Sequence, residues 1–169
     1  MAVREILLYP DPLLKQKCDL VTDFGAPLAE LVRDLRETLA ASPGVGIAAP
    51  QIGVLQRVVL IDVTGKFPER RQLVLVNPRI TTLEEYKIIR EGCLSIPEFT
   101  ANVRRADKVV FEALDEHGQP YAHRTDGLEA IAIQHETDHL DGVLFLDRVA
   151  CLKTDVFRRK TKPSARAQS

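Results

Sequence analysis

Several features are scarce or missing in this 169-residue sequence, and each absence excludes a class of protein. Only three cysteines are present, an odd number without the spacing of a disulfide framework, so we expect a reducing compartment. No apolar stretch has the length of a membrane span and no signal peptide is recognisable, so no membrane partner is expected. The formal net charge of -1 gives no general attraction to DNA. No internal repeat or long linker is present, and the length fits one domain.

Nucleotide-binding motifs are missing as well. Residues 44–51 (Gly-Val-Gly-Ile-Ala-Ala-Pro-Gln) contain two glycines. They lack the Gly-Lys-Ser/Thr ending of a P-loop and the third glycine of a dinucleotide fingerprint. We interpret this stretch as a tight turn of small residues.

The strongest positive signal lies at residues 134–142, where His135, Glu136 and His139 form the pattern His-Glu-x-x-His. Residues four apart lie on one face of an α-helix, so the two imidazoles can bind a single metal ion. Glu136 then lies beside them, where it can take a proton from a water activated by the metal. The motif predicts metal-assisted hydrolysis. The alternative is that the pattern arose by chance on an ordinary helix.

The residues around the motif predict that it lies on a buried helix. Asp126 and Glu129 have the spacing of a capping box, and Gly142 follows the last turn as a C-cap would. At about 100° per residue, one stripe of this helix is formed by Leu128, Ile131, Ala132, His135 and His139, and another side by Ile133 and Leu140. The helix is therefore predicted to be buried on most sides, and polar imidazoles there need partners.

A catalytic site of this kind needs a third protein ligand. The long form of the motif would place a histidine at position 145, but that residue is Phe145, and no Glu or His follows His139. The third ligand is therefore expected upstream, where the candidates are Cys18, Cys93, His117 and His123. Cys93 is the strongest candidate, because it follows a strand-like segment at 86–89 and Gly92 lets the backbone come close to a metal.

The other candidates have simpler interpretations. His117 lies in a predicted hairpin turn between the strand-like residues 109–114 and 121–123, where we expect a solvated tip. Cys18 and Cys151 are interpreted as small hydrophobic residues.

The remaining pattern predicts an α+β fold. Apolar residues recur at helical spacing between residues 27 and 41, and the apolar runs 57–63 and 73–77 predict buried strands. Residues 6–12 are expected to lie extended against the core, and residues 143–146 to form a buried strand. We predict antiparallel or mixed β-sheets wrapped around a central metal-binding helix, with an N-terminal helix.

Three stretches together resemble the signature motifs of peptide deformylases: residues 44–51, residues 91–95 (Glu-Gly-Cys-Leu-Ser) and residues 134–139 (Gln-His-Glu-Thr-Asp-His). They occur in the family's order and at about its spacing, and the resemblance extends to about Arg148. It implies a cytoplasmic enzyme of bacterial type that removes the N-formyl group from the N-terminal formyl-methionine of newly synthesised peptides. Two alternatives are a His-Glu-x-x-His zinc peptidase acting on internal peptide bonds and a non-catalytic metal-binding module.

The resemblance also implies roles for individual residues. A divalent metal would be held by Cys93, His135 and His139, with Glu136 as the proton carrier. The oxyanion would be held by the metal, the Gln51 side-chain amide and the Leu94 backbone N–H. The methionine side chain of the substrate would contact Val45, Gly46, Ile89, Glu91, Leu128, Ile131, Ala132 and His135.

The resemblance also bears on the cofactor and on a second partner. A thiolate ligand weakens the Lewis acidity of the metal and allows a redox-active ion; Fe(II) is usual in the family, while Zn(II), Ni(II) or Co(II) are expected in some preparations. We expect residues 1–157 to form a single catalytic domain and the basic residues 158–169 to form a flexible tail. That tail is predicted either to be solvated or to contact the ribosome near the peptide exit.

Overall fold

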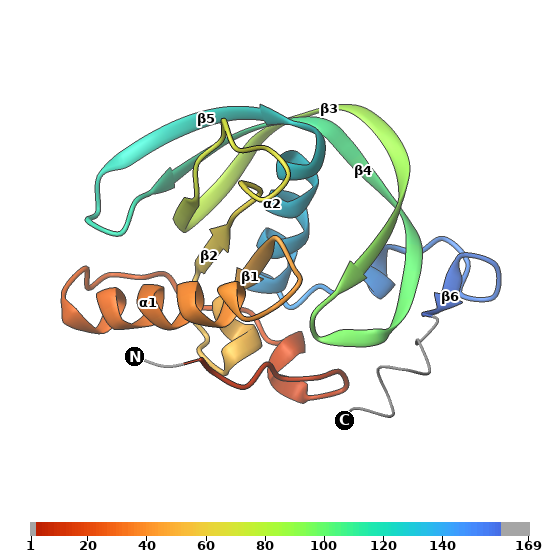
Figure 1. Ribbon diagram of the computed structural model, residues 1–169, viewed down its shortest axis with the longest axis horizontal. Helices are drawn as coiled ribbons and strands as arrows, with labels where there is room; N and C mark the ends of the chain where they lie inside the picture. Colours follow the sequence, from red (N-terminus) through yellow and green to blue (C-terminus); the bar gives the residue numbers. More distant parts are fainter. Residues whose placement is uncertain (1–2, 160–169) are drawn as a thin grey trace.

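The computed structural model describes residues 3–159, which form two α-helices and a six-stranded antiparallel sheet (Figure 1). The helices are α1 (Ala26–Ala40), α2 (Gly127–Leu140) and the short 3-10 helices η1 (Pro12–Lys15), η2 (Ala49–Ile52) and η3 (Phe145–Arg148). The strands are β1 (Gly46–Ala48), β2 (Val58–Ile61), β3 (Leu73–Cys93), β4 (Ile96–Leu114), β5 (Pro120–Asp126) and β6 (Val156–Arg158). The predicted α+β class is confirmed. Among the described residues, no helix is long and apolar enough to cross a membrane.

The sheet is organised around the long hairpin of β3 and β4. Its strand order is β1-β2-β3-β4-β5, and β6 pairs with β4. The hairpin extends from Val76 opposite Leu114 to Cys93 opposite Ile96, with shifts in register along its length. Such irregularities bend a strand pair, and in Figure 1 the hairpin curves past α2. Its closed end therefore brings Cys93 to His139 on that helix.

Strand β2 is buried between the two helices, and its residues alternate between two cores. Val58 and Leu60 pack in the cluster that contains the apolar face of α1, whereas Val59 and Ile61 pack in the cluster that contains Ile133 of α2. The α1 face is buried as predicted, through Leu28, Leu31, Val32, Leu35 and Leu39. Burial of each side chain of this size stabilises the folded state by about 1.5–3 kcal/mol. The α1 core therefore holds β2 firmly in place, and the opposite face of β2 supports α2.

Helix α2 is enclosed on most sides, as the sequence predicts. It packs against β1, β2, β4 and β5, and its Ile133 and Leu140 are completely buried. Gly142 follows the helix with φ 72°, the left-handed conformation of a C-terminal glycine, which confirms that prediction. Glycine is also needed there for space, because a Cβ would lie 2.5 Å from the Lys15 carbonyl oxygen.

The start of α2 differs from the prediction. Asp126 is the N-cap residue, but its side chain makes no capping hydrogen bond and instead accepts one from Arg70 Nη2 at 2.6 Å. Glu129 accepts a hydrogen bond from Thr125 Oγ1 at 2.6 Å. The predicted capping box is therefore wrong, because the distant Arg70 takes the Asp126 carboxylate and the neighbouring Thr125 takes the Glu129 carboxylate.

Two further local predictions are wrong. Residues 44–51 do not form a tight turn: Gly46–Ala48 is strand β1, paired with β2, and η2 follows it directly. Residues 143–146 do not form a strand: η3 begins at Phe145, and the Asp147 carboxylate accepts a hydrogen bond from the Leu144 backbone N–H at 2.9 Å. Pairing with β2 makes residues 46–48 a strand. The hydrogen bond to the Asp147 side chain favours a short helical turn after Leu144.

Candidate metal centre

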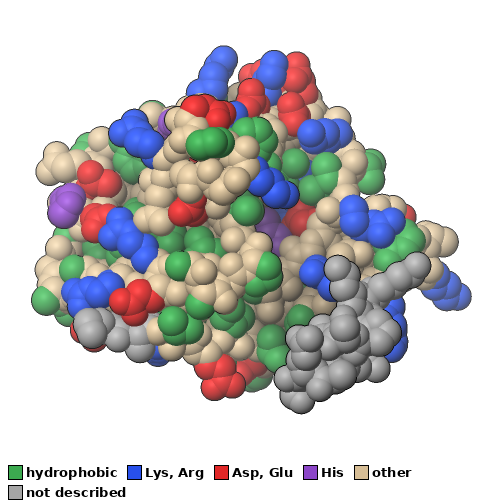
Figure 2. All heavy atoms as spheres, in the orientation of Figure 1, with side chains coloured by type: hydrophobic (Ala, Val, Ile, Leu, Met, Phe, Trp, Pro, Cys, Tyr) green, Lys and Arg blue, Asp and Glu red, His purple; other side chains and the backbone are tan. Residues whose placement is uncertain are grey.

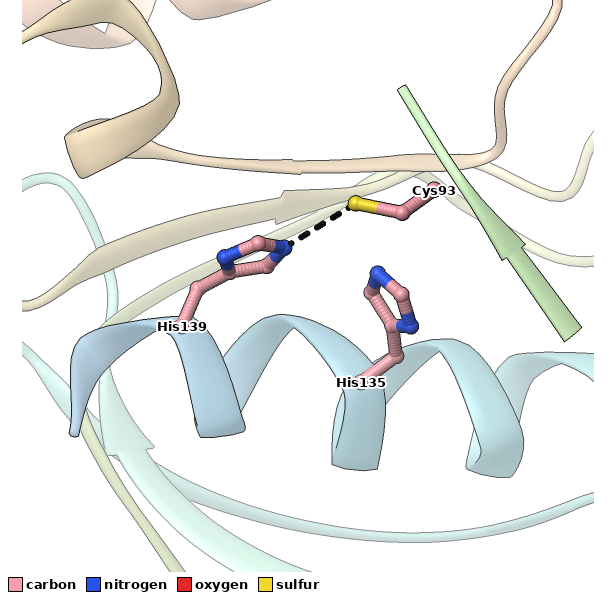
Figure 3. A group of neighbouring side chains, drawn as sticks. All are labelled: Cys93, His135 and His139. Carbon is pink, nitrogen blue, oxygen red and sulfur yellow. Dashed lines mark hydrogen bonds between the residues drawn. The ribbon is translucent and has the colours of Figure 1, made fainter. Parts of the chain in front are cut away.

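Three side chains that can bind a metal converge where the end of β3 meets α2 (Figure 3). Cys93 Sγ lies 3.4 Å from His139 Nε2, and ligand atoms of Cys93, His135 and His139 lie within 4.8 Å of one another. All three residues are buried. Figure 3 shows the two rings projecting from neighbouring turns of α2 toward the sulfur. Within residues 3–159 it is the one group of this kind.

Hydrogen bonds hold Cys93 and the turn that follows it. Ser95, in the turn between β3 and β4, accepts a hydrogen bond from the Tyr9 backbone N–H at 2.8 Å, so the N-terminal segment lies against the site. The extended form predicted for residues 6–12 is only partly confirmed, because residues 9–10 form a turn and Pro12 begins η1. Gln51 Nε2 donates to Ser95 Oγ at 3.1 Å and lies 3.8 Å from Cys93 Sγ. Because Gln51 Oε1 accepts from the Ala48 N–H at 2.9 Å, the amide has one orientation, with its NH2 group toward the thiol.

The His135 ring is held by a chain of buried charges. Its Nδ1 is hydrogen-bonded to the Glu91 carboxylate, which also accepts hydrogen bonds from Arg105 at 2.7 and 2.9 Å. Arg105 donates further to Asp138 at 2.8 Å, and Asp138 accepts from Arg148 at 2.6 Å. Burial acts to raise the pKa of Glu91, but the hydrogen bonds from Arg105 and His135 outweigh it and lower that pKa to about 2. The ionised carboxylate keeps a proton on Nδ1, which leaves Nε2 for a metal.

Glu136 lies beside the ligands with its carboxylate buried. Its Oε2 is 3.8 Å from His135 Nε2, and its Oε1 has no hydrogen-bond partner among the described residues. Burial raises the pKa of Glu136 to about 7, although the neighbouring His135 acts to lower it. A carboxyl group with such a pKa can both accept and release a proton near neutral pH. Gly46 of β1 makes room for it, because a Cβ there would lie 2.8 Å from Glu136 Cγ.

The donor set fits a divalent metal. A thiol and two imidazoles are ligands of zinc and other first-row metals, and three protein ligands are typical of catalytic sites that keep one position open. Glu136 Oε1 and His139 Nδ1 are buried without a hydrogen-bond partner in residues 3–159. Native proteins rarely leave buried polar atoms without a partner. A water in the site would give the Glu136 oxygen its partner.

The cluster opens into a cavity of about 810 Å³ between β1, β3 and α2. Its lining includes every residue predicted to contact a methionine side chain, namely Val45, Gly46, Ile89, Glu91, Leu128, Ile131, Ala132 and His135, and also Leu94. Figure 2 shows this hollow, with histidine and acidic atoms at its base. A larger hollow of about 930 Å³ lies along β5 and contains none of the three clustered side chains in its lining. We therefore assign the candidate site to the smaller cavity, because Cys93, His135 and Glu136 line it.

The sequence matches the family model described as polypeptide deformylase over residues 3–155. The chain belongs to this family. It is 40% identical over 162 residues to a peptide deformylase of Thermodesulfovibrio yellowstonii, covering 96% of this chain and 98% of that protein. A crystal structure of a peptide deformylase from Legionella pneumophila superposes with a TM-score of 0.85 at 42% identity, covering 90% of this chain and 89% of the other. A crystal structure of a peptide deformylase from Synechococcus elongatus in complex with actinonin superposes with a TM-score of 0.84 at 36% identity, covering 89% of this chain and 82% of the other.

In this deformylase chain, the two candidate histidines outside the motif do not reach the cluster. His117 lies in the turn between β4 and β5, as predicted, where its backbone N–H donates to Asp115. His123 Nε2 lies 3.4 Å from Glu129 and its ring packs at 5.7 Å from that of Phe111.

The other two cysteines of the deformylase chain have opposite environments. Cys18 is buried in a hydrophobic core, as predicted, and burial raises the pKa of its thiol to about 11. Cys151 is exposed, so its interpretation as a small buried hydrophobe is wrong. A hydrogen bond with the Thr154 side chain lowers the pKa of Cys151.

Sequence reasoning missed Arg105 and Arg159 in this deformylase site. Arg105 is 3% exposed although arginine is normally a surface residue, so a strand sequence gives no signal for its role. Arg159 lines the cavity from beyond the end of β6, and its position depends on strand pairing that the sequence pattern does not specify.

Proposed function

We propose that this site carries out the family's reaction, the hydrolysis of the N-formyl group from the N-terminal formyl-methionine of nascent peptides. The observation that supports it best is the cluster of Cys93, His135 and His139 beside the unpartnered carboxylate of Glu136, at the base of a cavity. Three ligands together with a buried acid are the elements of a hydrolytic metal site.

Glu136 is assigned the proton transfers. When bound to Cys93, His135 and His139, a divalent metal supplies a Lewis acid that polarises a carbonyl group and lowers the pKa of water. Glu136 accepts a proton from the water that attacks the formyl carbon and gives it to the nitrogen of the departing amine. The products are formate and a peptide with a free N-terminus.

Gln51 and Leu94 are assigned to the oxyanion that forms on the formyl oxygen. The Gln51 amide is held with its NH2 group toward Cys93, because its carbonyl oxygen accepts from Ala48. The Leu94 backbone N–H follows Cys93 directly in the chain. A preorganised donor of this kind contributes about 3 kcal/mol to the transition state in other hydrolases.

The methionine side chain is assigned to the apolar wall of the cavity. That wall is formed by Val45, Gly46, Ile89, Leu128, Ile131 and Ala132. Glu91 lines the same cavity, but its carboxylate is engaged by Arg105 and His135, so we assign it to holding His135 as well.

The reaction class is tested by comparing formyl-Met-Ala with an unformylated longer peptide. Release of formate from the first and no cleavage of the second is the expected result. Cleavage of internal peptide bonds would instead identify a zinc peptidase. Tight metal binding without either activity would identify a non-catalytic metal module.

Replacing Glu136 tests its role separately from that of the metal ligands. Glu136→Ala is expected to keep the metal and to lose turnover by about 10²–10⁴-fold, the usual contribution of a general acid–base group. Metal content and formate release would be measured on the same samples. Glu84→Ala, which removes an exposed glutamate of β3, is the matched control. Loss of metal in proportion to activity would make Glu136 a structural residue.

The metal itself is proposed to be Fe(II), with Zn(II), Ni(II) or Co(II) able to replace it. Iron beside a thiolate is open to oxidation, whereas zinc has no redox chemistry. Enzyme loaded anaerobically with iron is expected to react faster than zinc-loaded enzyme and to lose activity in air, with unchanged circular dichroism. Equal rates together with equal stability in air would contradict the assignment of iron.

Three broader assignments complete the proposal. Residues 1–157 are taken as one catalytic domain whose sheet wraps around α2, and the family match over 3–155 supports this assignment. The predicted tail begins at Arg158, the last residue of β6, and residues 160–169 lie outside the described residues. Contact of this tail with the ribosome near the peptide exit stays a prediction. Because the substrate is a nascent peptide, we assign the reaction to the cytoplasm.

A further inference from the structure

The lining of the candidate active-site cavity carries an excess of positive charge. Lys66, Arg90 and Arg159 line it, together with the carboxylates of Glu91 and Glu136. Glu91 is already neutralised by two hydrogen bonds from Arg105, so it does not offset the positive charge of the three cations. Within residues 3–159, no ion pair is found for any of the three cations. Their charge is therefore available to a molecule in the cavity.

Arg159 lies against the residue that precedes Cys93 in the chain. Its backbone N–H donates to the Glu98 carbonyl at 2.7 Å, which continues the pairing of β6 with β4 and fixes where its side chain begins. The guanidinium lies directly over Gly92, where even a Cβ would overlap Nη2. Gly92 precedes Cys93, so this guanidinium lies on the cavity wall next to the metal-binding cluster.

The neighbouring arginines have other contacts. Arg90 stacks its guanidinium on the Phe157 ring, with Cζ 3.6 Å from the centroid, and donates to Asn102 at 3.3 Å. Arg158 lies over Phe99 at 5.7 Å and does not line the cavity. Of the two arginines that line the cavity, Arg159 is thus the one whose guanidinium has no aromatic ring or carboxylate partner among residues 3–159.

This arrangement has a consequence for the part of the substrate that follows methionine. An extended peptide advances about 3.3 Å per residue, so the second or third residue of a bound peptide comes within reach of the Arg159 guanidinium. A guanidinium pairs best with a carboxylate, through two parallel hydrogen bonds. We propose that Arg159 is a specificity-determining residue that favours formylated peptides with a carboxylate at the second or third residue.

The inference rests on the proposed function and deepens it by naming a substrate class. Two sources of the carboxylate are possible, an acidic side chain or the free C-terminus of a short peptide. Both are recognised by the same chemistry, and peptide pairs separate them. Formyl-Met-Ala-Glu-amide is compared with formyl-Met-Ala-Gln-amide for the side chain, and formyl-Met-Ala-Ala acid with its amide for the C-terminus.

Arg159→Ala is tested on these pairs beside Arg158→Ala, which removes the same charge from the adjacent position outside the cavity. The wild type is expected to prefer the carboxylate peptide of a pair about three- to ten-fold in kcat/KM, within the range of a partly exposed charged pair. The preference should reside in KM and weaken with added salt. Arg159→Ala is expected to abolish it while leaving the Gln-amide peptide within about two-fold, and Arg159→Lys to retain part of it.

The outcomes separate the inference from the proposed function. A preference unchanged in Arg159→Ala, or lost equally in Arg158→Ala, would overturn the assignment of Arg159 while deformylation itself stands. A change in kcat for the uncharged peptides would make Arg159 a structural residue instead. Absence of formate release from every peptide would overturn the proposed function, and the inference with it.

Discussion

The contact between Gly46 and Glu136 allows a quantitative prediction about catalysis. A methyl group at position 46 would lie 2.8 Å from Glu136 Cγ, 3.0 Å from its Oε2 and 3.1 Å from Ile61 Cδ1. Carbon atoms make contact at about 3.5 Å or more, so Gly46→Ala must move the glutamate by about 0.7 Å. Glu136 is 5% exposed and Ile61 is completely buried, so neither can swing out into solvent.

The expected size of the effect follows from this displacement. A misplacement of about 1 Å in a reacting group lowers a rate by about 10²-fold. Gly46→Ala is therefore expected to lower kcat for a formylated peptide by about ten- to a hundred-fold. The metal should be retained, because the overlap is with the proton carrier and not with Cys93, His135 or His139.

The assay follows formate release together with metal content and the near-ultraviolet circular dichroism. Gly65→Ala is the matched control, because a Cβ at that position meets no atom within 4 Å. The reasoning would be refuted by a Gly46→Ala enzyme that turns over as fast as Gly65→Ala. It would also be refuted by a loss of metal that accounts for the whole loss of activity.

Two further predictions concern the stability of α2 and the reactivity of the thiols. Gly142→Ala is expected to lower the free energy of unfolding by clearly more than the roughly 1 kcal/mol that a left-handed conformation alone costs, because its Cβ would lie 2.5 Å from the Lys15 oxygen. Gly53→Ala, at φ 85° with open space around it, is the control that measures the conformational cost alone in urea unfolding. Equal losses of stability in the two variants would contradict the predicted overlap. Iodoacetamide at neutral pH is expected to label Cys151 long before Cys18. Cys151 is exposed and its pKa is lowered, whereas the Cys18 thiol is buried and has a pKa of about 11. Labelling would be followed by mass spectrometry of peptides, and faster labelling of Cys18 would contradict this order.

The parts of the fold that the sequence predicted are those with long periodic patterns. The apolar face of α1, the burial of α2 and the glycine at its end follow from spacing along one segment, and the structure agrees with each. The capping box at Asp126 failed because Arg70, more than fifty residues away in the chain, takes its carboxylate. The strand expected at residues 143–146 failed because Asp147 closes a short helical turn there. The apolar pattern of a segment gives no information about such hydrogen-bond partners.

The candidate site divides in the same way. His135 and His139 share a helix face, so their proximity could be derived from spacing alone. Cys93 lies more than forty residues earlier, and only the bent hairpin of β3 and β4 brings it to them. Position in the sequence alone could not have shown that Arg159 faces the cavity, since this depends on β6 pairing with β4.

The alternating charges of Glu91, Arg105 and Asp138 limit how this sequence can diverge. Each is 13% exposed or less in its side chain, and each neutralises its neighbour. Removing one member leaves an uncompensated charge in the interior, which typically costs about 3–5 kcal/mol, whereas replacing a whole buried ion pair by apolar residues can be neutral for stability. Single substitutions at these positions are therefore expected to be eliminated, and change can proceed only by coupled substitutions. Because Glu91 also holds His135, even a coupled substitution that preserves stability would leave the ring without its partner.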